Sequence, residues 1–380
     1  MLTISEMIGR IKGSERSKVT TSPSPGASNL SKGEPDFPTP AHIQDAAYQA
    51  MKNNFTHYVS SYGDEELREA ICFSLKRDYG VERKPANILV TAGGIAGINA
   101  IVATYVNPGD EVLMPDPGYS AYGECVNLFG GKVIYFPLSD TFHLDFQELE
   151  KRISRKSKMI FLCNPSNPTG IIWREEEIRA LGRIVLDHNL LLIVDEVYHK
   201  LVYGGVKHFS ICQIDALRER VILLDSFSKT YAMTGWRVGY LLAEKRMVED
   251  LELFHKTMMI CVNSVAQKAC VAALTGPQEC VQEMVAEYDR RRKFIYGALK
   301  EIQRISVFPC EGAFYFFPRF ENKMTSREMT DYLARKKIMV RSGTEFGRKG
   351  EKHIRISFTS RMDSLKEGME RLRDALNELG

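Results

Sequence analysis

The segment V-I-L-L-D-S-F-S-K-T-Y-A-M-T-G-W-R-V-G-Y-L-L-A-E, residues 221–244, is the stretch that decides the fold of this chain. It holds two apolar runs, 221–225 and 238–244, separated by a polar turn that contains a glycine. Runs of this kind are typical of strands buried on both faces of a sheet. The turn carries Lys229, with Ser226 and Ser228 before it and Arg237 after it. A lysine in such a place most often only caps a loop, so a function must be argued from the rest of the chain.

Further apolar runs precede this segment and alternate with stretches of helical period. One such stretch, residues 64–80, opens with Asp64 as a helix N-cap, carries acidic residues in its first turn and closes on Gly80. The alternation predicts an α/β fold, with a large domain built on a mostly parallel, doubly wound sheet. The earlier strands are expected at residues 87–91, 111–115, 132–137, 158–163 and 190–196.

The alternation of apolar runs with helical stretches ends at about residue 274. A long charged helix is expected at 277–303, followed by short strands and helices that make a small α+β unit. We therefore expect an N-terminal arm that is part of the small domain (1–45), a large domain (46–280) and a small C-terminal domain (281–380). The small domain is then formed by both chain ends. Within the arm, residues 1–13 predict a short amphipathic helix, and residues 20–40 predict an ordered but irregular loop.

Composition narrows the classes of function. The chain is 44% hydrophobic and 26% charged with a formal net charge of +3, which is ordinary for a globular protein and gives no reason to expect nucleic acid or membrane as a partner. Its first residues lack the pattern of a signal peptide, and no stretch has the length of a membrane span. Eight cysteines without a C-x-x-C pair indicate reduced core thiols, so we expect a cytoplasmic protein with no metal site.

The polar residues that follow the apolar runs point to one kind of chemistry. Ligands of open α/β sheets bind at the carboxyl ends of the strands. There the chain places a Gly93-Gly94 turn suited to phosphate, Tyr119, Asn167 between two prolines, and Asp195. A lysine, a carboxylate and phosphate donors suit a phosphate-bearing aldehyde with a basic ring nitrogen. Burial and the nearby Arg237 should lower the pKa of Lys229 and make its amine nucleophilic.

Seven motifs occur in an order that resembles a known family. They are Y-V-S-S-Y-G-D-E-E-L-R (58–68), P-D-P-G-Y (115–119), N-P-S-N-P-T-G (164–170), D-E-V-Y (195–198), S-F-S-K with G-W-R-V-G-Y (226–240), G-A-F-Y (312–315) and R-I-S-F (355–358). From G-E-P-D-F (33–37) onward, the chain resembles the class I/II aminotransferases of the aspartate aminotransferase superfamily, fold type I. The resemblance implies pyridoxal phosphate as cofactor. It also implies ping-pong transfer of an amino group between an amino acid and a 2-oxo acid.

The resemblance also implies roles for residues around the cofactor. Lys229 would form the Schiff base and move the substrate α-proton, and Asp195 would pair with the ring nitrogen. Tyr198 and Asn167 would hydrogen-bond the ring 3-oxygen, and Tyr119 would stack on the ring. The residues implied to hold the phosphate are Gly94, Ile95, Ser226, Arg237 and, with a loop cap as an equally good alternative, Ser228.

Two further implications concern the substrate and the assembly. Arg355 would grip the substrate α-carboxylate through a bidentate fork, aided by Asn167 and the backbone at Gly33. Tyr58 matches a tyrosine that reaches the phosphate of a neighbouring subunit, so we expect a homodimer with shared active sites.

Several nearby residues have a plainer interpretation. Tyr122, Tyr203 and Phe314 are expected in the pocket wall or the core, and Glu196 is expected to be solvated or ion-paired. His57, His143 and His199 lack the spacing of metal ligands and receive no role.

One departure from the family bears on the substrate. Many relatives that use aspartate carry a lysine two residues after the first glycine of the phosphate turn, where this chain has Ile95. An isoleucine cannot pair with a second carboxylate, and Phe37, Tyr119 and Phe358 are expected near the mouth, so we expect a neutral or aromatic amino acid. Glutamate or 2-oxoglutarate could still serve as the common partner if another basic residue, such as one from the N-terminal segment, makes the contact.

Two alternatives stay open at this point. The same fold and residues also support β- or γ-elimination, and no motif separates that lyase chemistry from transamination. A ligand sensor without catalysis is less favoured, because both Lys229 and Asp195 are present and too little chain precedes residue 30 for a helix-turn-helix module.

Overall fold

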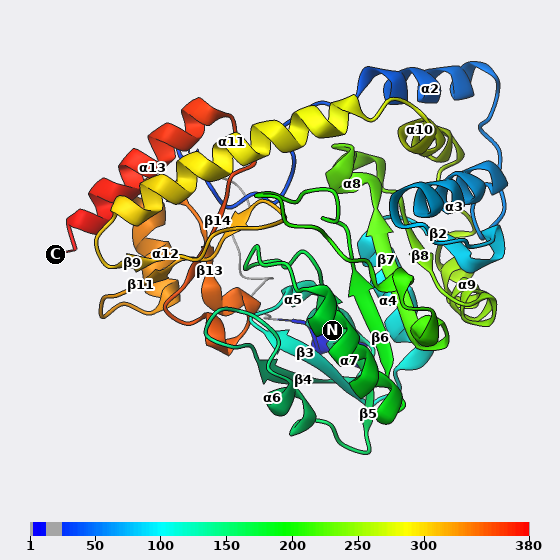
Figure 1. The fold of residues 1–380 in the computed structure, drawn as a ribbon, viewed down its shortest axis with the longest axis horizontal. Helices are drawn as coiled ribbons and strands as arrows, with labels where there is room; N and C mark the ends of the chain where they lie inside the picture. The colour runs from blue at the N-terminus through cyan, green and yellow to red at the C-terminus, as the bar shows by residue number, and fades with distance from the viewer. Residues whose placement is uncertain (1–2, 13–24, 380) are drawn as a thin grey trace.

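A seven-stranded sheet forms the centre of the computed structural model, which describes residues 3–12 and 25–379 (Figure 1). The strand order is β2-β8-β7-β6-β5-β3-β4; β8 runs antiparallel to β2 and β7, and the other neighbouring pairs in this sheet are parallel. The mostly parallel sheet expected from the apolar runs is therefore confirmed. Its strands are β2 (Ile88–Thr91), β3 (Glu111–Asp116), β4 (Lys132–Pro137), β5 (Ser157–Cys163), β6 (Leu191–Asp195), β7 (Val221–Ser226) and β8 (Gly239–Leu242).

Strand β4 departs from the expectation that all these strands are buried on both faces. It lies at the edge of the sheet with β3 as its neighbour in the sheet order, and Tyr135 is 41% exposed. Phe136 is the fully buried residue of this strand. An apolar run shows that a segment suits a strand, but it does not show where the strand lies in the sheet.

Helices cover both faces of the sheet, as a doubly wound fold requires. On one face lie α4 (Gly94–Tyr105), α5 (Ser120–Leu128) and α9 (Lys245–Met259), whose buried residues share a core with Ile193 and Leu224. On the other face lie α3 (Glu65–Tyr79), α7 (Glu175–Asp187) and α10 (Ser264–Thr275), which share a core with Val194 and Leu223. Side chains alternate along a strand. Asp195 consequently lies on the face of Ile193, and Glu196 lies on the opposite face.

The remaining elements of the first 300 residues are short or peripheral. Helix α2 (Ala41–Lys52) packs on α10, and α3 has the bounds expected between Asp64 and Gly80. Asp64 makes no side-chain cap bond and instead forms an ion pair with Lys268 at 2.6 Å. The others are α6 (Phe146–Glu150), α8 (Phe227–Thr230) and the 3₁₀ turns η2 (Pro85–Asn87), η3 (Ile211–Gln213), η4 (Asp215–Arg220) and η5 (Thr234–Trp236).

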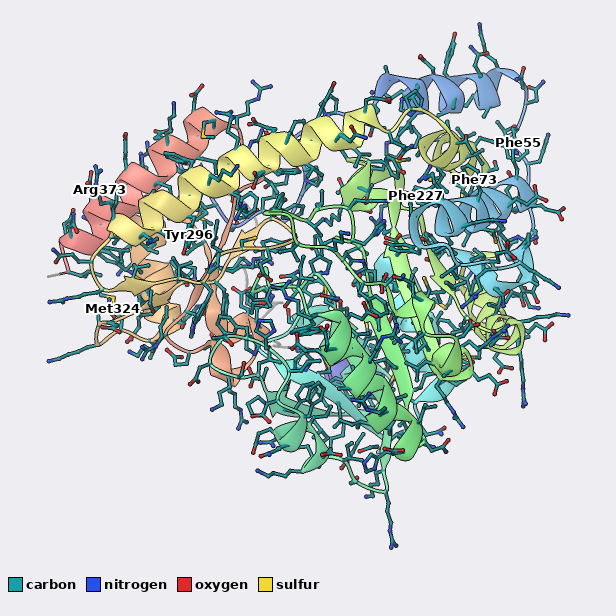
Figure 2. All side chains as sticks on the ribbon, viewed as in Figure 1. Phe55, Phe73, Phe227, Tyr296, Met324 and Arg373 are labelled. Atoms are coloured by element: carbon teal, nitrogen blue, oxygen red, sulfur yellow. The ribbon has the colours of Figure 1, made fainter. Side chains whose placement is uncertain are left out.

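The C-terminal part is an α+β unit, as expected. The long helix α11 (Glu279–Glu301) crosses above it in Figure 1, and Tyr296 of this helix, labelled in Figure 2, stacks on Phe316 with ring centroids 6.0 Å apart. Strands β10, β14 and β13 form a small antiparallel sheet. The elements are β9 (Ile305–Ser306), β10 (Tyr315–Phe316), β11 (Arg319–Phe320), α12 (Ser326–Arg335), β12 (Ile338–Met339), β13 (Arg341–Ser342), η6 (Gly343–Phe346), η7 (Arg348–Gly350), β14 (Ile354–Ser357) and α13 (Met362–Asn377).

The N-terminal segment joins this C-terminal unit. Strand β1 (Ser28–Asn29) pairs in parallel with β12, so residues near 28 lie beside residues near 338. The rest of residues 25–40 is irregular, as expected, and the expected N-terminal helix is the single turn α1 (Glu6–Gly9); residues 1–2 and 13–24 lie outside the described part. The division into domains near residues 45 and 280 stays a prediction. In the part of the chain that is described, no helix has the length and apolar character needed to cross a membrane.

Candidate active site

A cavity of about 680 Å³ opens where the strand ends meet the N-terminal segment and the C-terminal unit. It collects all but one of the residues to which the family resemblance gave a role in binding or catalysis. The residues it brings together are Gly33, Gly94, Ile95, Tyr119, Asn167, Asp195, Tyr198, Ser226, Ser228, Lys229, Arg237 and Arg355. Tyr58 does not line this cavity, and the residue is 80% exposed. The residues that line the cavity lie together, as the sequence predicts, and the roles assigned to them stay predictions.

Lys229 sits in α8, the short helix that begins as strand β7 ends, and its part-buried side chain lines the cavity. Its Nζ donates a hydrogen bond to the carbonyl of Gly33 at 2.7 Å. Burial lowers the pKa of Lys229 to about 8, the charge of Glu34 opposes this shift, and the charges of Arg355 and then Arg237 add to it. The sequence predicted the direction of this pKa shift, but it named Arg237 as the neighbouring cation, whereas the charge of Arg355 has the larger effect. A large fraction of the amine is therefore neutral near pH 8.

Asp195 closes strand β6 and is buried beside Lys229. Burial raises its pKa to about 6, and two hydrogen bonds act against this rise. The hydroxyl of Tyr122 donates to Oδ2 at 2.6 Å, and the N–H of Val197 donates to Oδ1 at 3.1 Å. Tyr122, expected only as wall or core, thus orients the carboxylate directly. Its spacing of three residues from Tyr119, close to one turn of α5, was the signal that could have indicated this.

The expectation that Glu196 is solvated or ion-paired is wrong. Glu196 is 2% exposed, on the sheet face away from the cavity, and its carboxylate accepts hydrogen bonds from Ser210 Oγ at 2.7 Å and from the N–H of Ile211 at 2.8 Å. Burial raises the pKa of Glu196 to about 8. Nε2 of His208 lies 3.9 Å from Oε2 of Glu196, and burial lowers the pKa of His208 to about 3, so this histidine is neutral. Near neutral pH Glu196 is mostly protonated and His208 is uncharged, so the two residues do not form an ion pair.

One end of the cavity is built to hold an anion. Gly93, with φ +79°, turns the chain into the N-terminus of α4, and a Cβ there would lie 2.6 Å from Nη2 of Arg237. Ser226 and Ser228 add hydroxyl groups 2.9 Å apart. It is Ser226 that caps the loop, since its Oγ accepts from the N–H of Ser228, which leaves Ser228 as part of the cavity lining. Helix N–H groups, hydroxyls and a guanidinium suit a phosphate.

The other end holds Arg355, which is buried among partners from three segments. Its Nη1 donates to Oδ1 of Asn167 at 3.0 Å, and its Nη2 donates to the carbonyl of Ser31 at 2.8 Å. The guanidinium lies over the ring of Tyr315, 4.2 Å from the centroid. These contacts fix a cation that can pair with a carboxylate, and Asn167 and Arg355 meet as the sequence expected.

Tyr315 is a cavity residue to which the sequence gave no role, although it ends the G-A-F-Y motif. Its hydroxyl lies 3.1 Å from that of Tyr198. A Cβ at Gly33 would clash with the same hydroxyl, so this close approach requires a glycine. Tyr119 is half-buried and meets Tyr122 edge to face, with ring centroids 5.2 Å apart.

The aromatic residues expected at the mouth are only partly confirmed. Tyr119 lines the cavity, whereas Phe37 packs edge to face on Tyr288 and Phe358 is fully buried in the core. Side chains alternate along β14 and its continuation, so the face that turns Arg355 to the cavity turns Phe358 away. Phe346, which sequence reasoning missed, lines the cavity instead. Phe314 and Tyr203 are buried in the core, as expected.

The described residues, 3–12 and 25–379, hold no group of three or more His, Cys, Asp or Glu side chains able to bind a metal ion. His143 pairs with Glu177 at 3.0 Å, and His199 lies 3.4 Å from Asp225. All eight cysteines are free thiols, and Cys163 is the one among them that lines the cavity.

The fold and the site together define a transferase that handles amino groups, and comparison with known proteins gives the family. The chain belongs to the class I and II aminotransferases, whose family model matches residues 26–372. It is 37% identical to a probable aspartate aminotransferase of Methanocaldococcus jannaschii over 90% of this chain and 91% of that protein. It is 36% identical to aromatic-amino-acid aminotransferase 2 of Thermococcus litoralis, covering 93% of this chain and 92% of that one.

Solved structures agree with this assignment. The crystal structure of an aromatic aminotransferase from Pyrococcus horikoshii superposes with a TM-score of 0.92 at 34% identity, covering 98% of this chain and 99% of that one. The family depends on pyridoxal phosphate. The anion site beside Gly93, the buried carboxylate of Asp195 and the amine of Lys229 suit the chemistry of that cofactor's phosphate, ring nitrogen and aldehyde.

Replacing Tyr122 by Phe tests the hydrogen bond that orients Asp195. Losing the hydroxyl raises the pKa of Asp195 above about 6, so less of the carboxyl is charged near neutral pH. We expect kcat/KM to fall about 10-fold, and the acidic limb of its pH profile to move to higher pH. Tyr203→Phe is the matched control, because it loses an equally buried hydrogen bond, to the carbonyl of Ala313. The control variant Tyr203→Phe should lower the free energy of unfolding and leave the pH profile unchanged. If the pH profile of Tyr122→Phe is also unchanged, Tyr122 does not set the protonation of Asp195.

Proposed function

We propose that this aminotransferase transfers the amino group of a neutral or aromatic L-amino acid to a 2-oxo acid in two half-reactions at the one cavity, a ping-pong mechanism. The observation that carries the proposal is the pairing of two groups at neighbouring strand ends. The amine of Lys229 has its pKa lowered to about 8, and the carboxylate of Asp195 is buried and held by two donors.

Pyridoxal phosphate, when bound, supplies an aldehyde that takes up amino groups and a ring that stores electrons released at the substrate α-carbon. The residues that would hold it follow from the chemistry of the cavity. Asp195 would face the ring nitrogen, and Tyr198 and Asn167 the ring oxygen. Tyr119 would cover the ring, and the residues suited to the phosphate are Gly94, Ile95, Ser226, Ser228 and Arg237.

The chain's own groups then perform three tasks. Arg355, fixed by Asn167 and Ser31, binds the substrate carboxylate and so orients the α-carbon. The neutral amine of Lys229 can accept the α-proton and return it, because its lowered pKa keeps both protonation states accessible near neutral pH. Asp195 stays charged above about pH 6 and can hold a proton at the ring nitrogen.

Lys229→Ala tests the proposal as a whole. We expect loss of the absorbance of the lysine-bound cofactor and a fall in turnover of more than about 1,000-fold, with some cofactor still held by the anion site. Lys245→Ala, which changes an exposed lysine paired with Glu249, is the control and should keep activity. Near-normal turnover in Lys229→Ala would contradict the proposal. In the unmodified enzyme, pyruvate and ammonia formed without the aminated cofactor would indicate lyase chemistry instead.

The preference for a neutral or aromatic donor is supported by the lining of the cavity. Ile95, in the first turn of α4, presents an apolar side chain there, and Tyr119, Tyr315 and Phe346 supply aromatic surface. The relatives bear both names, aspartate in one group and aromatic amino acid in the other, so their names alone leave the preference open.

Ile95→Lys tests this preference. A lysine there adds a cation near the substrate side chain, so kcat/KM for aspartate or glutamate should rise about 10-fold relative to phenylalanine. Ile95→Leu keeps the wall apolar and should leave the ratio unchanged. If Ile95→Lys does not change the ratio of acidic to neutral donors, Ile95 does not face the substrate side chain. A clear preference of the unmodified enzyme for aspartate would contradict the assignment.

We also propose a homodimer, because Tyr58 is far more exposed than an active-site tyrosine of the same chain would be. Exposed apolar side chains accompany it, among them Met258 and Ile260 at the end of α9. The hydroxyl of Ser264 donates a hydrogen bond to the carbonyl of Phe55. This bond holds the segment that carries Tyr58 close to the segment that follows α9. A second copy that covers this surface would bring Tyr58 to a neighbouring anion site. The cytoplasmic location stays a prediction.

Mixing Tyr58→Phe chains with Lys229→Ala chains tests the shared site. If Tyr58 acts across the interface, a hybrid dimer contains one unmodified site, and activity should rise above the sum of the two separate preparations. Tyr48→Phe in place of Tyr58→Phe is the control, because Tyr48 is also an exposed tyrosine. Strictly additive activity in the mixture, or an active monomer in sedimentation, would contradict the dimer.

A further inference from the structure

Asp116 joins the large sheet to a loop of the C-terminal unit. It is the last residue of β3 and is 5% exposed. Its Oδ1 accepts a hydrogen bond from the N–H of Lys349 at 2.9 Å. Two residues further along the chain, the N–H of Gly118 donates to the carbonyl of Phe346 at 2.7 Å. Two hydrogen bonds therefore tie the end of β3 to residues 343–350, which hold η6 and η7 and are called the clamp loop below.

The backbone of the clamp loop approaches the carboxylate of Asp116 closely. Gly347, between η6 and η7, has φ +131°, a conformation that favours glycine. A Cβ at Gly347 would clash with Oδ1 of Asp116, so this approach also requires a glycine. Burial raises the pKa of Asp116, and the N–H groups of Lys349 and then Arg348 oppose this rise. Donors that face a charged carboxylate have this effect.

Phe346 connects the clamp loop to Arg355, the cation suited to a substrate carboxylate. Phe346 is 3% exposed and lines the cavity. The guanidinium of Arg355 lies over the ring of Phe346, with Cζ 4.9 Å from the centroid, and over the ring of Tyr315 at 4.2 Å. An aromatic face attracts a cation, and more strongly where water is excluded. The position of Phe346 therefore limits where the guanidinium can lie.

A second contact holds the clamp loop within its own unit. Glu345 forms an ion pair at 2.8 Å with Arg341 of β13, which also lines the cavity. This pair fixes the loop relative to β13 and β14. The bonds made by Asp116 and Gly118 instead fix the loop relative to the large sheet. Because Arg355 lies on β14 and the reactive amine follows β7, the alignment of the two depends on contacts of this second kind.

We propose that Asp116 is a positioning residue for the substrate carboxylate: through the clamp loop it holds Phe346 against Arg355 and keeps the guanidinium aligned with the large sheet. This inference rests on the proposed function, in which Arg355 binds the carboxylate that all substrates share. It extends that function to a residue that does not line the cavity. Loss of the clamp should consequently weaken every amino acid and 2-oxo acid by a similar factor, whatever its side chain.

Asp116→Ala tests the clamp in the enzyme loaded with pyridoxal phosphate. The N–H of Lys349 loses its acceptor, so KM for each amino acid and 2-oxo acid should rise about 10-fold as the displaced guanidinium loses a charge-assisted hydrogen bond. The value of kcat should change less than about threefold, because Lys229 and Asp195 are untouched. Asp116→Asn keeps an acceptor oxygen for the same N–H and should hold KM within about threefold of that of the unmodified enzyme.

Calorimetry with the unreactive acids propanoate and 3-phenylpropanoate gives a readout that does not depend on turnover. Both should bind more weakly to Asp116→Ala, and by the same factor. Ser210→Ala is the matched control, because it removes a hydrogen bond to another buried carboxylate, that of Glu196 on the sheet face away from the cavity. It should lower the free energy of unfolding and leave both KM and the binding of the two acids unchanged.

A double-variant cycle tests the route through Phe346. Phe346→Leu removes the ring over which Arg355 lies and should itself weaken substrates. If Asp116 acts through Phe346, adding Asp116→Ala to Phe346→Leu should raise KM by less than about twofold further, since residues that act as one unit are not additive. Effects that multiply in the double variant would contradict this route.

Three further results would overturn the inference. They are an unchanged KM in Asp116→Ala, an Asp116→Asn variant as weak as Asp116→Ala, and a rise in KM confined to substrates of one side-chain class. Arg355→Lys separates this failure from failure of the proposed function, because it keeps the charge but loses the fork. If Arg355→Lys weakens no substrate, the carboxylate site of the proposed function is wrong. If it weakens all of them and Asp116→Ala weakens none, the inference alone is wrong.

Discussion

The buried carboxylate of Asp195 is the constraint on which the rest of the site depends. It closes a strand whose other residues are apolar, and burial there raises its pKa to about 6. The hydroxyl of Tyr122 and the N–H of Val197 oppose that rise. A carboxylate in such a place is tolerated only with donors and cations close by. The positions of β6 between β5 and β7 and of α5 above the sheet supply these partners, so the sheet topology and the chemistry of the site are one arrangement.

Three distant parts of the chain meet at the opposite side of the cavity. The N-terminal segment contributes the carbonyls of Ser31 and Gly33, which accept hydrogen bonds from Arg355 and Lys229. The turn after β5 contributes Asn167, which accepts from the same arginine. These bonds tie the N-terminal segment and β14 to the large sheet, while β1 and β12 pair beside them. The geometry of the substrate end therefore depends on how the chain ends pack together.

Electrostatics explains why the cavity suits anionic ligands. Two carboxylates just outside the lining, Glu34 and Glu345, form ion pairs with Lys32 and Arg341 and so offset part of the repulsion among the basic side chains. Burial and the neighbouring cations lower the pKa of Lys229, so more of this amine is neutral and nucleophilic than in an exposed lysine. The positive charge of the cavity also favours binding of phosphate and carboxylate groups. An aminotransferase needs a reactive amine and binding sites for anions in one cavity.

The sequence by itself determined the strands, the residues at their ends and the family. These are local features: an apolar run fits a buried strand wherever it lies, and the polar residue that follows it lies at the ligand-binding edge of a parallel sheet. Only the tertiary structure decided which side chains face the cavity. Glu196 turned out to be buried on the far face, Phe358 entered the core, and Tyr122, Tyr315 and Arg341 joined the site. Facing depends on strand register and on which layer covers each side, and both are set by contacts between segments far apart in the chain.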